Sequence, residues 1–200
     1  MIIAMMDYVK YKGDTMKNKS NLFEVYDPRG QILIEKRNLS NRKNTLNGLR
    51  LAILDNSKWN ANKILRGSAD ALSKEIKFSK INYYVKKHGF STDAPLEMID
   101  EITNDNDIVL TAIGDCGSCC SSCIRDAITL EDRGIPAAPI ITTEFINETK
   151  LTRVAIGMPD LRPVVIDHPV SSITNDEVLQ RVKIIKEQAQ EVWLGQRKDI

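Results

Sequence analysis

The segment DIVLTAIG, residues 107–114, is apolar almost throughout and is followed at once by polar and small residues. A strand with apolar side chains on both faces must be covered on both faces. This is typical of an inner strand of a parallel sheet between two layers of helices. LRLAILDN (49–56) is a second buried strand segment, and INYYVKK (81–87) is a third. The longer segments between these strands indicate an α/β protein.

Helical patterns fill the segments between the strands. In 60–76 the apolar residues recur three and four positions apart, and 174–195 opens with a Thr174/Glu177 capping box. The segment 137–146 starts as a strand, and its sequence leaves open whether it continues into a helix. The alternation of strands and helices predicts a doubly wound, mainly parallel sheet. The predicted strands are 49–56, 81–87, 107–114, 137–146 and 162–169, and the predicted helices are 60–76, 95–103, 122–134 and 174–195.

The N-terminal quarter of the chain has a different pattern. Strand-like runs at 22–26 and 31–35 flank Asp-Pro-Arg-Gly, whose proline and glycine suit a type I turn, so we predict a β-hairpin. A polar linker at 38–48 follows. The sequence therefore predicts an extension over 1–48 and an α/β domain over 49–200. Because an added hairpin can extend a neighbouring sheet, a homo-oligomer is left open.

Composition narrows the class of protein. The 200 residues suffice for one domain with a buried core, and the formal net charge is +1. This balance gives no electrostatic reason to expect nucleic acid or an anionic membrane as a partner. We find no apolar run near 20 residues and no signal-peptide pattern at the start, and we therefore expect a cytoplasmic protein without a membrane span.

Polar residues gather where the predicted parallel strands end. Ligands of such folds bind outside the carboxyl ends of the strands, so we expect these residues to share one crevice that binds a small-molecule substrate. His168, after the fifth strand together with Asp167, is a candidate general acid–base. The substrate-binding candidates are Asp55, Asn56, Ser57, Lys58, Asp115, Gly117 and Ser118.

All four cysteines of the chain lie in this region, as Cys116, Cys119, Cys120 and Cys123. Cys116 follows a strand, and the other three are predicted in the first turns of a helix, where free N–H groups and the helix dipole stabilise a thiolate. The C-x-x-C spacing, which both Cys116/Cys119 and Cys120/Cys123 satisfy, brings a resolving thiol near an attacking one. All four are candidate catalytic residues, and we expect Cys116 to be the most reactive.

The same cysteines also allow a metal site. Cys116, Cys119 and Cys123 are the candidate ligands of zinc or an iron–sulfur cluster. A four-thiolate cage from so short a stretch is geometrically awkward, so a cluster would need an open site or further ligands. Nothing in the sequence matches the glycine-rich motifs that bind nucleotides.

The stretch GDCGSCCSSC resembles the UGSC family, which is named after a Sec-Gly-Ser-Cys motif and in which some members carry selenocysteine where this chain has Cys116. The resemblance covers roughly 49–185, and three further segments carry it: LDNSKWNA (54–61), RDAITLEDRGIPAAPIITTEF (125–145) and GMPDLRPVVIDHP (157–169). It implies a three-layer, flavodoxin-like domain with a thiol or selenol at its centre. Two features depart from the family pattern, namely a cysteine at the selenocysteine position and the extra thiol of Cys120.

Together these observations predict a thiol-dependent enzyme that acts on a small molecule by redox or sulfur-transfer chemistry. Cys116 would attack and Cys119 would resolve the intermediate, with a thiol or a protein reductant as partner. The alternative is a cysteine-ligated metal or iron–sulfur protein that uses the same cluster.

Overall fold

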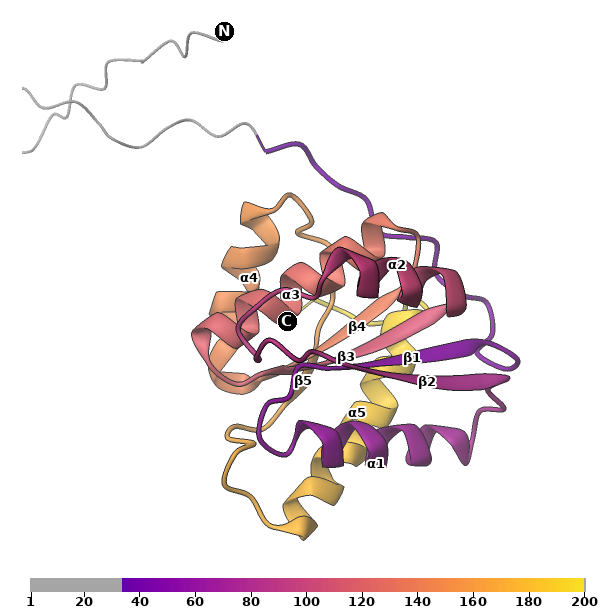
Figure 1. The fold of residues 1–200 in the computed structure, drawn as a ribbon, viewed down its shortest axis with the longest axis vertical. Coiled ribbons are helices and arrows are strands. Elements are labelled where there is room, and N and C mark those ends of the chain that lie inside the picture. Colours follow the sequence, from indigo (N-terminus) through magenta and orange to yellow (C-terminus); the bar gives the residue numbers. More distant parts are fainter. Residues whose placement is uncertain (1–33, 200) are drawn as a thin grey trace, which may run out of the picture. The chain divides into compact units, whose positions relative to one another are not determined.

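The computed structural model describes residues 34–199, and its centre is a five-stranded parallel sheet with strand order β2-β1-β3-β4-β5 (Figure 1). The strands are β1 (Arg50–Asp55), β2 (Lys80–Val85), β3 (Ile108–Gly114), β4 (Ala137–Thr142) and β5 (Val164–Ile166). The helices are α1 (Ala61–Ser73), α2 (Leu96–Asp105), α3 (Gly117–Asp132), α4 (Ile146–Ala155) and α5 (Asn175–Trp193), with a short 3₁₀ turn, η1 (Thr143–Phe145). The predicted doubly wound α/β fold is confirmed, and this strand order is the flavodoxin-like one.

Helices cover both faces of the sheet. In Figure 1, α1 and α5 lie on one face, and α2, α3 and α4 lie on the other. Alternate side chains of each strand point to the two cores, so that Leu51 and Ile53 meet α1 and α5, whereas Ala52 and Leu54 meet the opposite layer. All seven residues of β3 are buried, which accounts for the almost entirely apolar run in its sequence. None of the helices within residues 34–199 has the length and apolarity needed to cross a membrane.

The segment that leads into β1 lies against the α/β unit. Leu46 is buried in the core, and Ser40 donates hydrogen bonds to the carboxylate of Glu131 on α3. The predicted hairpin at 22–35 falls outside the described residues except for Ile34 and Glu35, which belong to neither a helix nor a strand. The hairpin therefore stays a prediction.

Several predicted boundaries differ from the structure; the fifth strand, for example, is predicted at 162–169 and spans Val164–Ile166. The helix predicted at 122–134 begins earlier, at Gly117, because the sulfur of Cys116 accepts the amide of Cys119 and caps the first turn. The segment 137–146 starts as a strand, as predicted, and the continuation into a helix that its sequence left open is observed, since β4 ends at Thr142 and η1 and α4 follow. The capping box of Thr174 and Glu177 at the start of α5 is confirmed.

The order of the sheet reverses between β1 and β3. The chain leaves β1 for α1 on one face and leaves β3 for α3 on the other, so the carboxyl ends of these neighbouring strands form the switch point of the sheet. In open α/β sheets this switch point is where ligands bind.

Gly114, the last residue of β3, allows α3 to approach the sheet closely. A Cβ at this position would lie 2.9 Å from the Cα of Cys120 and 3.0 Å from Ile141 Cγ2. We therefore expect Gly114→Ala to lower the free energy of unfolding by about 1–3 kcal/mol, as is usual for overpacking. Gly117→Ala is the matched control, since a Cβ there meets nothing within 4 Å. Urea unfolding of both variants measures the difference, and equal stabilities would contradict the close approach.

Candidate active site

Cys116 is the cap residue of α3 and the least buried of the four cysteines. Its sulfur lies 3.4 Å from the amide nitrogen of Cys119, which donates to it, and 3.8 Å from the hydroxyl of Ser118. Gly117 and Ser118, both exposed, form the first turn of the helix behind it. The thiol thus stands where the free N–H groups of a helix end converge.

The surroundings of Cys116 favour its thiolate. Burial by itself would raise the pKa of the thiol, but hydrogen bonds from the thiol and amide of Cys119 and from Ser118, together with the charge of Lys58, outweigh it. The net shift of the pKa is downward from the ordinary value of 9.0. A lowered thiol pKa is a recognised mark of reactive cysteines.

Cys119 has the opposite environment. Its side chain is buried, and its sulfur accepts the amide of Asp115 at 3.2 Å and donates to the carbonyl oxygen of Cys116 at 3.2 Å. Burial, followed by the interaction with Cys116, raises the pKa of Cys119 to about 12. At neutral pH this thiol therefore keeps its proton beside the Cys116 sulfur.

Cys120 and Cys123 point into the protein. The sulfur of Cys120 lies 3.2 Å from Thr149 Oγ1 on α4, and burial raises its pKa to about 11. Cys123 packs under the sheet, with its sulfur 3.8 Å from the carbonyl oxygens of Thr111 and Ile140, and burial raises its pKa as well. Within residues 34–199, no three His, Cys, Asp or Glu side chains are arranged to hold a metal ion. A metal or iron–sulfur site on these sulfurs would require them to turn toward one point.

The loop after β1 lies at the same edge of the sheet as the cysteines, as the sequence predicts. The amide nitrogen of Asn56 donates to Ala112 at 3.0 Å, and its side-chain amide donates to Ile113 at 3.1 Å, which ties the loop to β3. Ser57 and Asn60 both have positive φ angles, of 62° and 63°. Non-glycine residues in this conformation are uncommon, and they cluster at functional sites.

Two residues of this loop have defined environments. Asp55 accepts the amide of Ser57 at 2.7 Å, and burial raises the pKa of its carboxyl. The ammonium of Lys58 lies 4.6 Å from the centre of the Phe90 ring. That the four residues 55–58 bind substrate stays a prediction.

Asp115 and His168 form a pair beside Cys116. The Asp115 side chain is 2% exposed, and one of its oxygens, Oδ1, lies 2.9 Å from Nδ1 of His168. The other oxygen accepts the hydroxyl of Ser171 at 3.2 Å. The imidazole also lies 3.1 Å from Thr142 Oγ1 and packs near the ring of Phe145. The carboxylate of Asp115 is therefore turned toward His168. Asp167, which precedes His168 in the sequence, is exposed, and its carboxylate lies 3.9 Å from Arg181.

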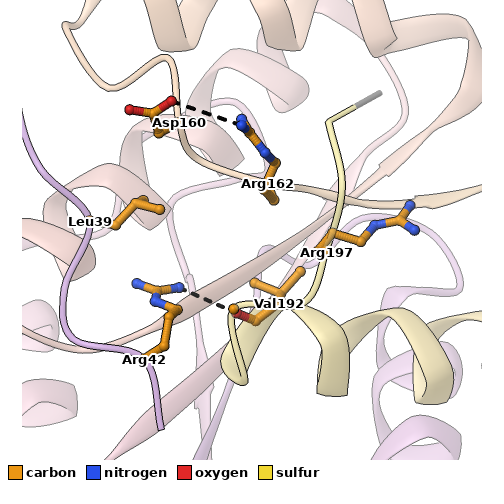
Figure 2. A pocket seen from close by; sticks show the side chains of 7 residues that line it. Leu39, Arg42, Asp160, Arg162, Val192 and Arg197 are labelled. Carbon is orange, nitrogen blue, oxygen red and sulfur yellow. Dashed lines mark hydrogen bonds and ion pairs between the residues drawn. The ribbon is translucent and has the colours of Figure 1, made fainter.

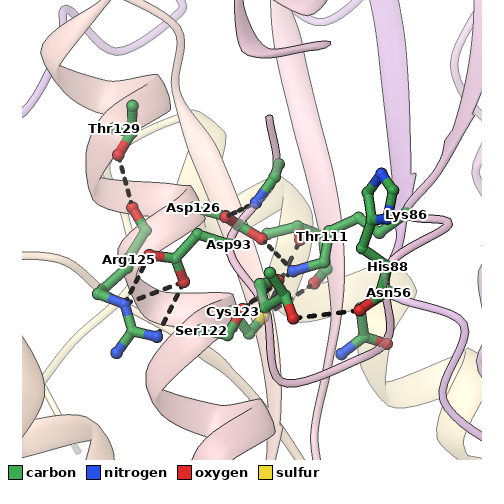
Figure 3. Close-up of polar contacts among 12 residues, drawn as sticks. Asn56, Lys86, His88, Asp93, Thr111, Ser122, Cys123, Arg125, Asp126 and Thr129 are labelled. Carbon is green, nitrogen blue, oxygen red and sulfur yellow. Dashed lines mark hydrogen bonds and ion pairs between the residues drawn. The ribbon is translucent and has the colours of Figure 1, made fainter. Parts of the chain in front are cut away.

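A buried ion pair lies under the site and was not anticipated from the sequence. Figure 3 shows Lys86, which follows β2, reaching the carboxylate of Asp126 on α3 at 2.7 Å and the hydroxyl of Ser122 at 2.9 Å. The other oxygen of Asp126 accepts the amide of Ala94 at 2.8 Å. Asp126 is therefore not a surface charge, since its side chain is 3% exposed. The pair joins α3 to the end of β2 and to the loop that follows.

A pocket of about 290 Å³ is at the other end of the sheet (Figure 2). Trp193, beside it at the end of α5, donates to the carbonyl oxygen of Val109 near the start of β3, whereas Cys116 follows the end of that strand. Three arginines line this pocket. Each already has a carboxylate partner: Arg42 pairs with Glu131, Arg162 with Asp199 and Arg197 with Glu191. We interpret this as a structural ion network and not as the reaction site.

The fold and the site together define a flavodoxin-like α/β protein with a partly exposed cysteine directly after its central strand. A family model, that of the UGSC family, matches residues 24–195. The chain therefore belongs to the UGSC family, as its cysteine motif predicts. No curated protein matches the chain. Among solved structures, the flavodoxin-like domain of a Synechococcus sp. protein is similar, with 9% identity, a TM-score of 0.39, and coverage of 74% of this chain and 99% of that one.

Proposed function

We propose that this protein is a thiol-dependent oxidoreductase in which Cys116 and Cys119 act as one dithiol. The observation that carries the proposal is the contrast between the two neighbouring sulfurs. The pKa of the partly exposed Cys116 is lowered, whereas that of the buried Cys119 is raised to about 12. This is the arrangement that thiol–disulfide chemistry needs, with one sulfur ready to attack and one held in reserve.

The proposed reaction begins at the sulfur of Cys116. Its thiolate attacks one atom of a weak S–S or O–O bond in a small substrate, and the other atom leaves with the bonding electron pair and takes up a proton. Cys119 then attacks the Cys116 sulfur, displaces the remaining group and forms a disulfide. The substrate gains two electrons and two protons overall, and an external thiol reductant returns the disulfide to the dithiol.

The environment of Cys119 determines the order of the two reaction steps. Two of the causes that raise its pKa, the hydrogen bond to Cys116 and the charge of Cys116, act while Cys116 is a thiolate. Both end once Cys116 is covalently bound to substrate. Burial, the largest cause, still raises the pKa of Cys119, but that pKa falls from its value in the free dithiol, so the resolving thiol is more reactive after the first step than before it.

The proposal is tested by oxidising the full-length protein with a small disulfide and mapping the products. We expect a loss of two hydrogens per chain and a single disulfide between Cys116 and Cys119. Metal analysis of protein purified without oxygen accompanies the mapping. Stoichiometric zinc or iron bound through these cysteines, or a disulfide confined to Cys120 and Cys123, would overturn the proposal.

Replacing Cys119 by alanine tests the resolving role separately. The Cys119 side chain is one of the groups that lower the pKa of Cys116, so its loss should move that pKa upward, while the backbone amide of residue 119, which donates to the Cys116 sulfur at 3.4 Å, still lowers it. The rate of Cys116 alkylation should therefore rise at higher pH than in the wild type, and reaction with a disulfide should stop at the mixed disulfide. Iodoacetamide kinetics over pH and intact mass measure both effects. Cys120→Ala is the control, and equal behaviour of the two variants would refute the assignment.

A further inference from the structure

We propose that Asp115 is a positioning residue that holds His168 as the general acid for the group displaced by Cys116. This inference rests on the proposed thiol chemistry and names its proton source. It departs from the sequence-based expectation that Asp115 binds substrate, because the carboxylate is turned toward other protein groups.

The first observation is the state of the Asp115 carboxylate. Its side chain is 2% exposed, and the hydroxyl of Ser171 satisfies only one of its oxygens. Among the described residues, no hydrogen-bond donor is aimed at the other oxygen, Oδ1, although Nδ1 of His168 lies 2.9 Å from it. A buried carboxylate oxygen without a donor is costly. A proton on Nδ1 supplies the missing donor, and a small rotation of the ring completes the hydrogen bond.

The second observation fixes which ring nitrogen carries that proton. Thr142, at the end of β4, donates its hydroxyl proton to the carbonyl oxygen of Gly114 at 3.4 Å. Its oxygen, 3.1 Å from Nδ1 of His168, then faces the ring as an acceptor. Two acceptors, Thr142 and Asp115, thus meet Nδ1, which favours a proton there and leaves Nε2 as the nitrogen that exchanges protons.

The third observation is the position of the ring. His168 comes from the segment after β5, and its imidazole reaches across the end of β4 to the residue that immediately precedes Cys116. Its side chain is 32% exposed, so the ring is open to a substrate and to solvent. The phenyl ring of Phe145, with its centre 5.9 Å from that of the imidazole, supports it.

These contacts define a balanced proton transfer. When the Cys116 thiolate attacks a disulfide, the departing sulfur takes the bonding electron pair, and the imidazolium of His168 gives it the Nε2 proton. The products are a mixed disulfide on Cys116, a free thiol and a neutral imidazole, which takes its next proton from solvent. The carboxylate of Asp115, as an acceptor 2.9 Å from Nδ1, keeps the proton of the neutral ring on that nitrogen.

The experiment compares leaving groups of different basicity. Full-length wild type, His168→Asn and Asp115→Asn react with 2-hydroxyethyl disulfide, whose thiolate leaves poorly, and with an aromatic nitrobenzoate disulfide, whose thiolate leaves without a proton. We expect His168→Asn to slow the first reaction by about 10²- to 10⁴-fold, the usual contribution of a general acid, and to leave the second nearly unchanged. His88→Asn, which alters the other histidine of the chain, is the matched control.

Asp115→Asn needs a readout that a purely structural role would not move. Imidazole ¹⁵N spectra supply one, because the chain has two histidines, His88 and His168. An asparagine can donate its amide proton to Nδ1 and so favour the other tautomer. We expect the His168 signals to change tautomer in this variant while those of His88 stay fixed, together with the same selective loss toward the poor leaving group.

The outcomes separate the two proposals. If His168→Asn slows both disulfides equally or neither, or if Asp115→Asn leaves the His168 tautomer unchanged, the inference about Asp115 and His168 is overturned while the dithiol chemistry stands. If the wild type reacts with neither disulfide, both fail together.

Discussion

Replacing Cys116 by serine is expected to abolish thiol reactivity at neutral pH, although the protein contains three more cysteines. A serine hydroxyl is a comparable hydrogen-bond acceptor for the amide of Cys119 but does not ionise near neutrality, so the helix cap survives and the nucleophile is lost. The three remaining thiols are buried, and burial is the largest cause of the raised pKa of each. A thiol whose pKa is about 12, as for Cys119, is ionised in about one molecule in 10⁵ at pH 7.

Iodoacetamide labelling over pH 6–10, followed by peptide mapping, measures this loss. In the wild type, label should appear first on Cys116, and the rate should rise through a pKa below the ordinary value of 9.0. The sign follows from the thiolate, since alkylation increases as pH rises through the pKa and then levels off. Cys120→Ala should keep this profile. Rapid labelling of Cys120 or Cys123 in Cys116→Ser, at neutral pH and in folded protein, would show that the nucleophile is another sulfur.

The shared edge of the sheet could be predicted because it depends on strand direction alone. Once β1 and β3 are parallel neighbours, the residues after both strands emerge at the same end. Ser57 and Cys116 therefore lie at the same end of the sheet, independently of the interactions of their side chains. The start of α3 could not be placed in the same way, because Gly117 and Ser118 are typical turn residues. The helix begins there because the sulfur of Cys116 caps it, which is a contact between side chain and backbone that spacing does not show.

The buried pair of Lys86 and Asp126 could not be predicted from local sequence patterns. Lys86 follows a strand in the same way as Asn56 and Asp115, but the sequence Lys-Lys-His-Gly is typical of a solvated turn. Its burial is decided by Asp126, which lies 40 positions away on another element. The local signal that existed is the spacing of Ser122 and Asp126, whose four-residue separation puts both polar side chains on one face of α3.

Lys86→Met should destabilise the protein strongly without touching a cysteine. The variant leaves the carboxylate of Asp126 buried at 3% exposure with no cation, and breaking a buried pair on one side typically costs about 3–5 kcal/mol. Urea unfolding measures the loss. Arg125→Met is the matched control, because Arg125 lies on α3 next to Asp126 and pairs with Asp93 at the surface (Figure 3). A surface pair of this kind contributes about 1 kcal/mol or less.

The loss in Lys86→Met should also depend on pH, in a direction set by Asp126. Burial already raises the pKa of this carboxyl, and Lys86 is the first of the groups that lower it, so the variant raises that pKa further. A group whose pKa is higher in the folded state favours folding when protonated. The added instability should therefore be small below the unfolded value of 3.8, grow as pH rises and reach its full size above the folded pKa.

The double variant Lys86→Met/Asp126→Asn separates charge from packing. Asparagine removes the buried charge and keeps an oxygen for the amide of Ala94, which donates to Asp126 at 2.8 Å. If the uncompensated carboxylate is what costs stability, the double variant should regain most of the loss, and its pH dependence should vanish. A double variant no more stable than Lys86→Met would place the cost in the lost packing of the lysine stem. Lys86 would then stabilise the protein through the packing of its side chain between β2 and α3, and not through its charge.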